Sequence, residues 1–298
     1  MSSLLTGFRA AALLVTTTAL LAGGAGGGVA LAAVSPWQVA AILKVGGETR
    51  PFGQPSGWYH DPVSDRVYVA DPENDRLLSF SPSGDFLAEF NAGGEIRKPA
   101  DMIKDGKGIF RVLEYEYAGL VEVDPARRSA TRHDLLSKGV PVYPRRISPS
   151  NDGFLVLDKK SGSLVFYDGN YRETARIDCP DPGGFRDFVL HGGEILALSG
   201  KKIHRYAPTG EHRDATPLAE TIEFPVSLAC DPGGLVYLLD RHAGKVAVLQ
   251  PGGQVASTFL GRGENEGELQ YPSLIRFDAR ERLWIVDEGN NRVMVLRK

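Results

Sequence analysis

A short apolar run that ends in an acidic residue, or once in serine, recurs six times along this chain. The last positions of successive runs are separated by 43, 44, 41, 41 and 47 residues. Because nearly every position in a run is apolar, each run is predicted to be a β-strand covered on both faces. The six runs occupy residues 67–71, 110–114, 154–158, 195–199, 236–240 and 283–287.

Each apolar run belongs to a longer unit that contains several short strands. In the first unit, residues 57–60, 66–71, 76–80 and 85–90 are predicted to be strands, separated by turns rich in Pro, Asp, Ser and Gly. The fourth strand of a unit is polar and variable, which suits an outer edge. A Pro-led segment precedes the apolar run in five units, beginning at Pro55, Pro99, Pro144, Pro225 and Pro272.

A period of roughly 40–45 residues with four strands per unit is typical of a β-propeller blade. We therefore predict an all-β fold: a single six-bladed β-propeller with four antiparallel strands per blade. A seven-bladed ring and two three-bladed domains are disfavoured, since no seventh run exists and no linker interrupts the period. The blades are expected at about 55–90, 99–135, 144–178, 184–218, 225–260, and 272–298 together with 37–46.

The last blade is predicted to be closed by the N-terminal strand of the fold. The sixth unit stops at Lys298, at the end of its third strand. An apolar segment at 39–45, followed by Gly46 and Gly47, resembles the fourth strand of the fifth unit. Its pairing with the last strand would remove an open edge from the ring.

The first 32 residues are predicted to be a signal peptide, and residues 33–298 the propeller. Arg9 precedes a long apolar stretch, and Ala30 and Ala32 fit the A-x-A cleavage pattern, with cleavage after Ala32. The alternative is an uncleaved N-terminal membrane anchor, because residues 10–34 contain no charge. Either interpretation places the propeller outside the cytoplasmic membrane, in the periplasm or secreted, with no other membrane contact.

Charge and cysteine content exclude some classes of function. The formal net charge is −3, from 34 basic and 37 acidic residues, and gives no electrostatic reason to expect a nucleic-acid partner. The two cysteines, Cys179 and Cys230, fall near opposite faces of the predicted ring, so two unpaired thiols are expected. No C-x-x-C motif points to redox chemistry.

The first and sixth units closely resemble the NHL repeat. The resemblance rests on VYVAD-x-x-N-x-R-L at 67–77 and LWIVD-x-x-N-N-R-V at 283–293, and it extends over residues 37–298, more weakly in the second and fourth units. It implies a structural acid–base pair at neighbouring strand ends. The implied pairs are Asp71 with Arg76, Asp287 with Arg292, and Asp240 with Lys245 in place of arginine.

The candidate binding site lies where inner strands begin, at the channel mouth on the face where blades are joined. Residues two positions after each Pro should line this mouth. The cluster has two interpretations: a self-neutralising network that plugs the channel, or a site for an anionic group, because arginine binds carboxylates in a bidentate manner. The cluster consists of Asp101, Arg145, Arg146, Arg186 and Asp187.

An enzymatic function is the alternative to binding. Six-bladed lactonases and related hydrolases resemble the predicted fold and hold a metal with acids and amides, but this ring offers arginines among only two acids. Amidating lyases of related fold use zinc-binding histidines, and the six histidines here are not expected to converge. We therefore expect no catalytic residue, no metal and no cofactor. The expected function is an exported, monomeric binding or scaffold module for a protein, a peptide, or an anionic small molecule or saccharide; the alternative is a channel-mouth hydrolase or lyase.

Overall fold

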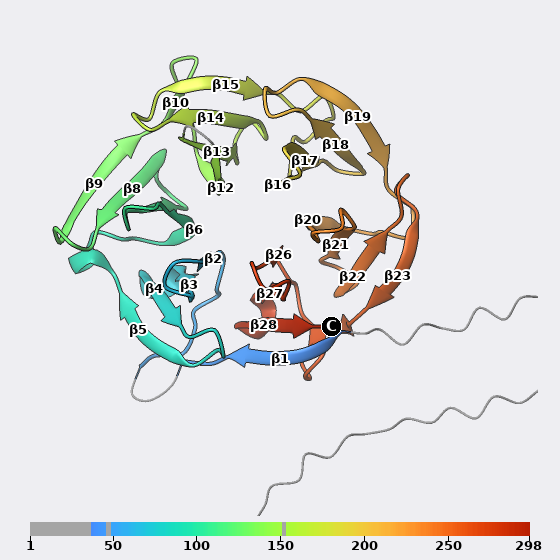
Figure 1. The fold of residues 1–298 in the computed structure, drawn as a ribbon, viewed down its shortest axis with the longest axis horizontal. Helices are drawn as coiled ribbons and strands as arrows, with labels where there is room; N and C mark the ends of the chain where they lie inside the picture. Colours follow the sequence, from blue (N-terminus) through green and yellow to red (C-terminus); the bar gives the residue numbers. More distant parts are fainter. Residues whose placement is uncertain (1–36, 46–48, 151–152) are drawn as a thin grey trace, which may run out of the picture. The chain divides into compact units, whose positions relative to one another are not determined.

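The computed structural model describes residues 37–45, 49–150 and 153–298, which form a six-bladed β-propeller (Figure 1). Each blade is an antiparallel sheet of four strands. Blade one contains β2 (Trp58–Asp61), β3 (Arg66–Asp71), β4 (Arg76–Phe80) and β5 (Phe86–Phe90); blade two contains β6 (Pro99–Lys104), β7 (Phe110–Glu114), β8 (Gly119–Asp124) and β9 (Ser129–Asp134); blade three contains β12 (Pro144–Ser150), β13 (Gly153–Asp158), β14 (Leu164–Asp168) and β15 (Glu173–Ile177).

The remaining blades follow the same order around the ring. Blade four contains β16 (Asp187–His191), β17 (Glu194–Leu198), β18 (Lys202–Tyr206) and β19 (His212–Pro217); blade five contains β20 (Pro225–Cys230), β21 (Val236–Asp240), β22 (Lys245–Leu249) and β23 (Val255–Phe259); blade six contains β26 (Leu274–Phe277), β27 (Leu283–Asp287), β28 (Arg292–Arg297) and β1 (Gln38–Leu43). The predicted all-β, six-bladed architecture is confirmed.

The ring closes through β1. This strand pairs antiparallel with β28, so that Val39 lies opposite Leu296 and Leu43 opposite Val293. Figure 1 shows β1 as the outermost strand of blade six, beside the end of the chain. The closing strand predicted from the sequence is therefore present, and it covers the edge of β28 that would otherwise be open.

The hydrophobic core is divided among the blade interfaces. Six clusters of buried apolar side chains occur in the described residues, and each joins two neighbouring blades. Between blades six and one, for example, Trp284 stacks on Trp58 with ring centroids 5.0 Å apart. The apolar residues three positions after each Pro or its equivalent, on the inner strands, are all buried and fall in different clusters: Trp58, Met102, Ile147, Phe188, Leu228 and Ile275.

The two faces of the ring differ in their connections. On one face, which we call the linking face, each blade connects to the next and the second strand of a blade turns into the third. On the other, which we call the hairpin face, the first strand of a blade turns into the second. Asp–Arg pairs lie on the linking face: Arg76 Nε donates to Asp71 at 2.8 Å, and Arg292 Nε donates to Asp287 at 2.8 Å.

The pair expected in blade five does not form. Asp240 and Lys245 are opposite each other in the strand register, but no ion pair joins these two described side chains. The Asp240 carboxylate instead accepts four backbone N–H groups, from Glu223, Phe224, His242 and Ala243. These four donors meet the hydrogen-bonding capacity of the carboxylate without Lys245. A lysine ammonium also lacks the planar pair of N–H donors with which a guanidinium binds a carboxylate.

The two cysteines are free, as predicted. Cys230 is buried at the end of β20, and Cys179 is half-buried in the loop after β15. The expected signal peptide, residues 1–32, lies outside the described residues. In the part of the chain that is described, no helix is long and apolar enough to cross a membrane.

Candidate channel site

A buried ion pair crosses the channel from blade four to blade six. Arg276 Nη2 donates to Asp187 Oδ1 at 2.6 Å, and Arg276 Nη1 donates to Asp187 Oδ2 at 2.7 Å. Ser227 of blade five donates its hydroxyl to Asp187 Oδ2 at 2.5 Å. Burial would raise the pKa of Asp187, but the Arg276 charge and hydrogen bonds hold the pKa below its usual value.

Arg276 also ties the ends of several inner strands together. Its Nη1 donates to the carbonyl oxygens of Leu228 and Ile275, each at 2.8 Å, and its Nη2 donates to the carbonyl oxygen of Phe188 at 3.0 Å. Burial would lower the pKa of Arg276, but Asp187 raises it above its usual value. The guanidinium is therefore a fixed positive charge inside the channel.

Asp101 occupies the other side of the channel, on β6. It is 6% exposed, and its carboxylate accepts the N–H groups of Met102 at 3.0 Å and Ile147 at 3.2 Å. Burial raises the pKa of Asp101 to about 6, although the charges of Arg146 and Arg276 act against this shift. A carboxyl with this pKa exchanges its proton near neutral pH, so it can act as a general acid or base.

The three predicted arginines do not form one cluster. Arg146 is buried and donates to the Ser273 carbonyl oxygen at 3.3 Å. Arg186 is half-buried, donates to the Pro225 carbonyl oxygen at 2.9 Å, and lies 4.7 Å from the Phe224 ring centroid. Arg145 is half-buried; its carbonyl oxygen accepts from Arg146 Nη1 at 3.4 Å, but its side chain makes no hydrogen bond or ion pair with any described residue. Of the five predicted residues, Asp101, Arg146 and Asp187 thus lie in the channel, whereas Arg145 and Arg186 lie beside it.

A pocket of about 290 Å³ reaches from the channel charges to the hairpin face. Asp101 and Arg276 line its inner part, and Pro62 and Ala279 line it in turns of the hairpin face. The sequence predicts access from the linking face. This pocket instead lies toward the opposite, hairpin face, and the Arg276–Asp187 pair lies at its inner end.

His60 lines the same pocket and is held by a carboxylate. Its Nε2 lies 3.0 Å from Asp65 Oδ1, and Asp65 is also bonded by Arg280 of blade six. The hydrogen bond with His60 and the charge of Arg280 hold the pKa of Asp65 below its usual value. When neutral His60 donates from Nε2 to Asp65, its Nδ1 is the basic nitrogen. The pocket therefore combines an oriented imidazole, a carboxyl and a guanidinium.

Sequence reasoning missed Arg276 and His60 for different reasons. Leu274 is the sixth of the positions expected to line the channel mouth, and Arg276 lies two positions further along the strand. Because side chains two positions apart share a strand face, considering the next residue on that face would have found Arg276. For His60, the sequence indicates only that it is one of six histidines that are not expected to converge. Its partner Asp65 is five residues away, at the end of a turn with φ of 53°.

No protein-family model matches this chain, and no curated protein matches it by sequence. Solved structures with the same fold are nevertheless numerous. At low sequence identity, such likeness shows a six-bladed β-propeller and does not show an activity.

Three of these structures illustrate the range of functions. A virginiamycin B lyase from Staphylococcus aureus is 12% identical with a TM-score of 0.63, over 88% of this chain and 99% of that one; another structure of that enzyme is a catalytically inactive histidine-to-alanine variant with quinupristin. A gluconolactonase from Xanthomonas campestris is 15% identical with a TM-score of 0.62, over 82% and 86%. An auxiliary nutrient binding protein from Bacteroides thetaiotaomicron is 15% identical with a TM-score of 0.63, over 88% and 76%.

Proposed function

We propose that this protein is a lyase or hydrolase that acts on a small molecule in the channel pocket. The observation that supports this proposal is that His60, Asp101 and Arg276 line one pocket of about 290 Å³. This enzyme was the alternative to the binding module expected from the sequence. Its proposed site lies on the hairpin face rather than the linking face. We retain as proposals that the repeats are of the NHL type, that residues 1–32 direct export, and that the protein is a monomer.

The three side chains suit proton transfer next to a polarised carbonyl group. His60, oriented by Asp65, is proposed to remove a proton from carbon or from water. Arg276 Nε, which has no hydrogen bond to a described residue, is available for a substrate oxygen that gains negative charge. Asp101 is proposed to supply the proton that the leaving oxygen takes up when its bond to carbon breaks.

The proposed substrates contain an ester or lactone bond. This chemistry yields either elimination, with loss of a proton and an oxygen leaving group, or hydrolysis by an activated water. The similar structures of a virginiamycin B lyase with quinupristin and of a gluconolactonase support this substrate class, so quinupristin and gluconolactone are the first compounds to test.

The test is a panel of gluconolactone, quinupristin and simple esters against the purified protein and its variants. We expect turnover of at least one compound and a loss of about 100-fold or more in His60→Gln and Asp101→Asn. His242→Gln is the matched control, because His242 lies in the turn after β21 and stacks on Phe224. Turnover by no compound, or equal turnover by all folded variants, would contradict the proposal.

A second candidate is binding of an anionic ligand on the linking face. Arg145 has no described partner there, and Tyr115 and Tyr143 are 38% and 36% exposed on the same face. Aromatic faces and a free guanidinium suit an anionic saccharide. Binding that is lost in Arg145→Ala and retained in Asp101→Asn would favour this function over catalysis.

A further inference from the structure

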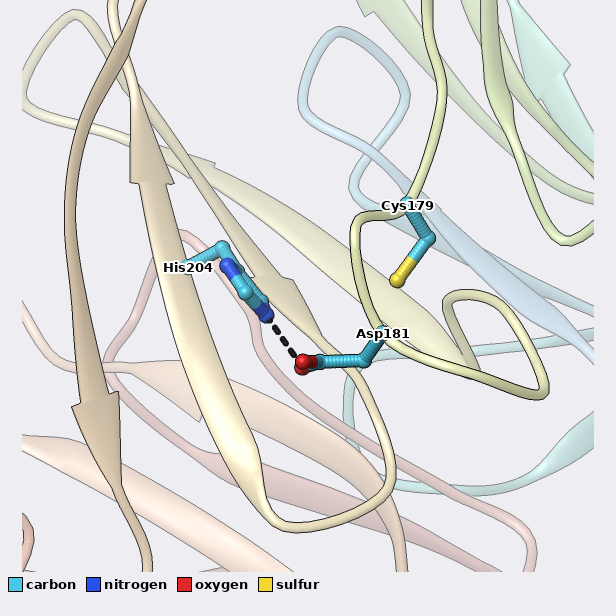
Figure 2. A group of neighbouring side chains, drawn as sticks. All are labelled: Cys179, Asp181 and His204. Carbon is cyan, nitrogen blue, oxygen red and sulfur yellow. Dashed lines mark hydrogen bonds and ion pairs between the residues drawn. The ribbon is translucent and has the colours of Figure 1, made fainter.

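A cysteine, an aspartate and a histidine meet on the linking face of blade four, as Figure 2 shows. Cys179 and Asp181 lie in the loop after β15, and His204 lies on β18. One possible ligand atom from each side chain falls within 4.8 Å of the other two. His204 is 2% exposed, and the other two side chains are half-buried.

In the strand register of blade four, Lys202 lies opposite Ser199, as Arg76 lies opposite Asp71 in blade one. His204 lies two positions further along β18, opposite Ala197. Arg76 also donates to the carbonyl oxygens of Arg50 and Pro51, so the guanidinium ties the preceding loop to its blade. In blade four the strand ends in Ser199 instead of an acid, and Asp181 supplies a carboxylate there from the preceding loop.

Asp181 ties this loop to blade four through hydrogen bonds with Ser199, Lys202 and His204. His204 Nε2 lies 2.7 Å from Asp181 Oδ2, while its Nδ1 is buried and has no partner among the described residues. In blade one, a single guanidinium makes four hydrogen bonds, to Asp71, Glu89 and two loop carbonyl oxygens. In blade four, the Lys202 ammonium and the His204 imidazole reach Asp181 instead. Imidazole commonly binds a metal, whereas a guanidinium does not.

We propose that Cys179, Asp181 and His204 bind a zinc-like divalent cation, which joins the loop after β15 to β18 of blade four. Thiolate sulfur, imidazole nitrogen and carboxylate oxygen are the ligands that zinc uses in proteins. One thiolate, one carboxylate and a neutral imidazole balance the two positive charges. The thiol proton leaves to solvent when the metal binds.

The carboxylate and the imidazole require only a small rearrangement to share a cation. Ligand atoms at normal zinc distances in a tetrahedron lie about 3.3 Å apart or more, so Asp181 Oδ2 and His204 Nε2 must separate by roughly half an ångström. Ser199 Oγ lies 2.6 Å from Asp181 Oδ2 and 3.3 Å from His204 Nε2, so it or a water can occupy the fourth position. Lys202, which donates to Asp181 Oδ1 at 2.7 Å, is 46% exposed and can move to solvent.

The test uses the untagged chain, treated with a chelator and titrated with Co²⁺ as a spectroscopic probe for zinc. We expect one Co²⁺ per chain, with a thiolate-to-cobalt charge-transfer band that Zn²⁺ abolishes by competition. Cys179→Ser should lose the band, and Cys230→Ser, which changes the other free cysteine, should keep it. His204→Gln should weaken binding by about tenfold or more, and Lys202→Met should strengthen it.

A second measurement, made on the wild-type chain, tests the site even if a variant fails to fold. In the wild-type chain, Zn²⁺ should slow the modification of Cys179 by a thiol reagent and leave that of Cys230 unchanged. Absence of the band in the wild type, persistence of the band in folded Cys179→Ser, or equal modification of Cys179 with and without Zn²⁺ would each overturn the site.

Discussion

The carboxylate of Asp187 accepts hydrogen bonds from both terminal nitrogens of Arg276, at 2.6 and 2.7 Å, although 89 residues separate the two in the chain. Asp187 is fully buried, and its pairing with a guanidinium from the sixth blade joins the two blades on either side of blade five. Removing one member of such a pair leaves a buried charge without a partner.

We expect Arg276→Met to lower the free energy of unfolding by about 3–5 kcal/mol. Urea unfolding followed by circular dichroism measures this loss. The double variant Asp187→Asn with Arg276→Met should recover part of the stability, because it removes both charges. Arg145→Ala is the control and should stay within about 0.5 kcal/mol of wild type, since Arg145 has no described partner. Equal stabilities of Arg276→Met and wild type would show that the pair does not hold the ring.

The closing strand β1 should be required for full stability. Leu43 is 1% exposed and packs in the cluster between blades six and one, so Leu43→Ala should cost about 2–5 kcal/mol. Its exposed neighbour provides the matched control, Lys44→Ala, with little expected change. Deletion of residues 33–46 should expose the edge of β28 and cause aggregation, which light scattering can follow. A deletion variant that melts at the wild-type temperature would rule out this role of β1.

Trp284 should be the most sensitive position of the second strands. It is fully buried, stacks on Trp58, and donates its indole N–H to Asp278 at 2.8 Å. Trp284→Ala should cost about 3–5 kcal/mol, because a large cavity remains between two blades. Trp284→Phe keeps most of the apolar contact but loses the donor, so its smaller loss separates packing from hydrogen bonding. Similar losses for both variants would assign the whole effect to the hydrogen bond.

Asp101 should make stability depend on pH between about 4 and 6. Its pKa is raised to about 6 in the folded protein, whereas an unfolded aspartate titrates near 3.9. The folded state therefore binds more protons in this range, and stability contributed by the protonated carboxyl is lost as pH rises through 6. The loss should be on the order of 2–3 kcal/mol, and it should be absent in Asp101→Asn. Parallel stability curves for the two proteins across this range would contradict the shifted pKa.

The repeated pattern along the chain determined the fold without any knowledge of tertiary contacts. Alternation and apolar runs are local properties of the chain, so strand positions and the six-unit period can be found from neighbouring residues alone. The missing fourth strand after Lys298 and the spare strand before Pro55 were likewise visible, since closure of a ring leaves one strand to be supplied from the other end. Ring closure by β1 confirms that inference.

The partners across the channel were decided only by the tertiary structure. Arg186 is next to Asp187 in the sequence, but adjacent residues on a strand point to opposite sides, and Arg276 from blade six takes the carboxylate instead. His204 similarly meets Cys179 and Asp181 because the loop before blade four folds back onto β18. Strand periodicity specifies which face a side chain occupies, whereas the position of each blade around the ring and the path of each loop determine what it meets there.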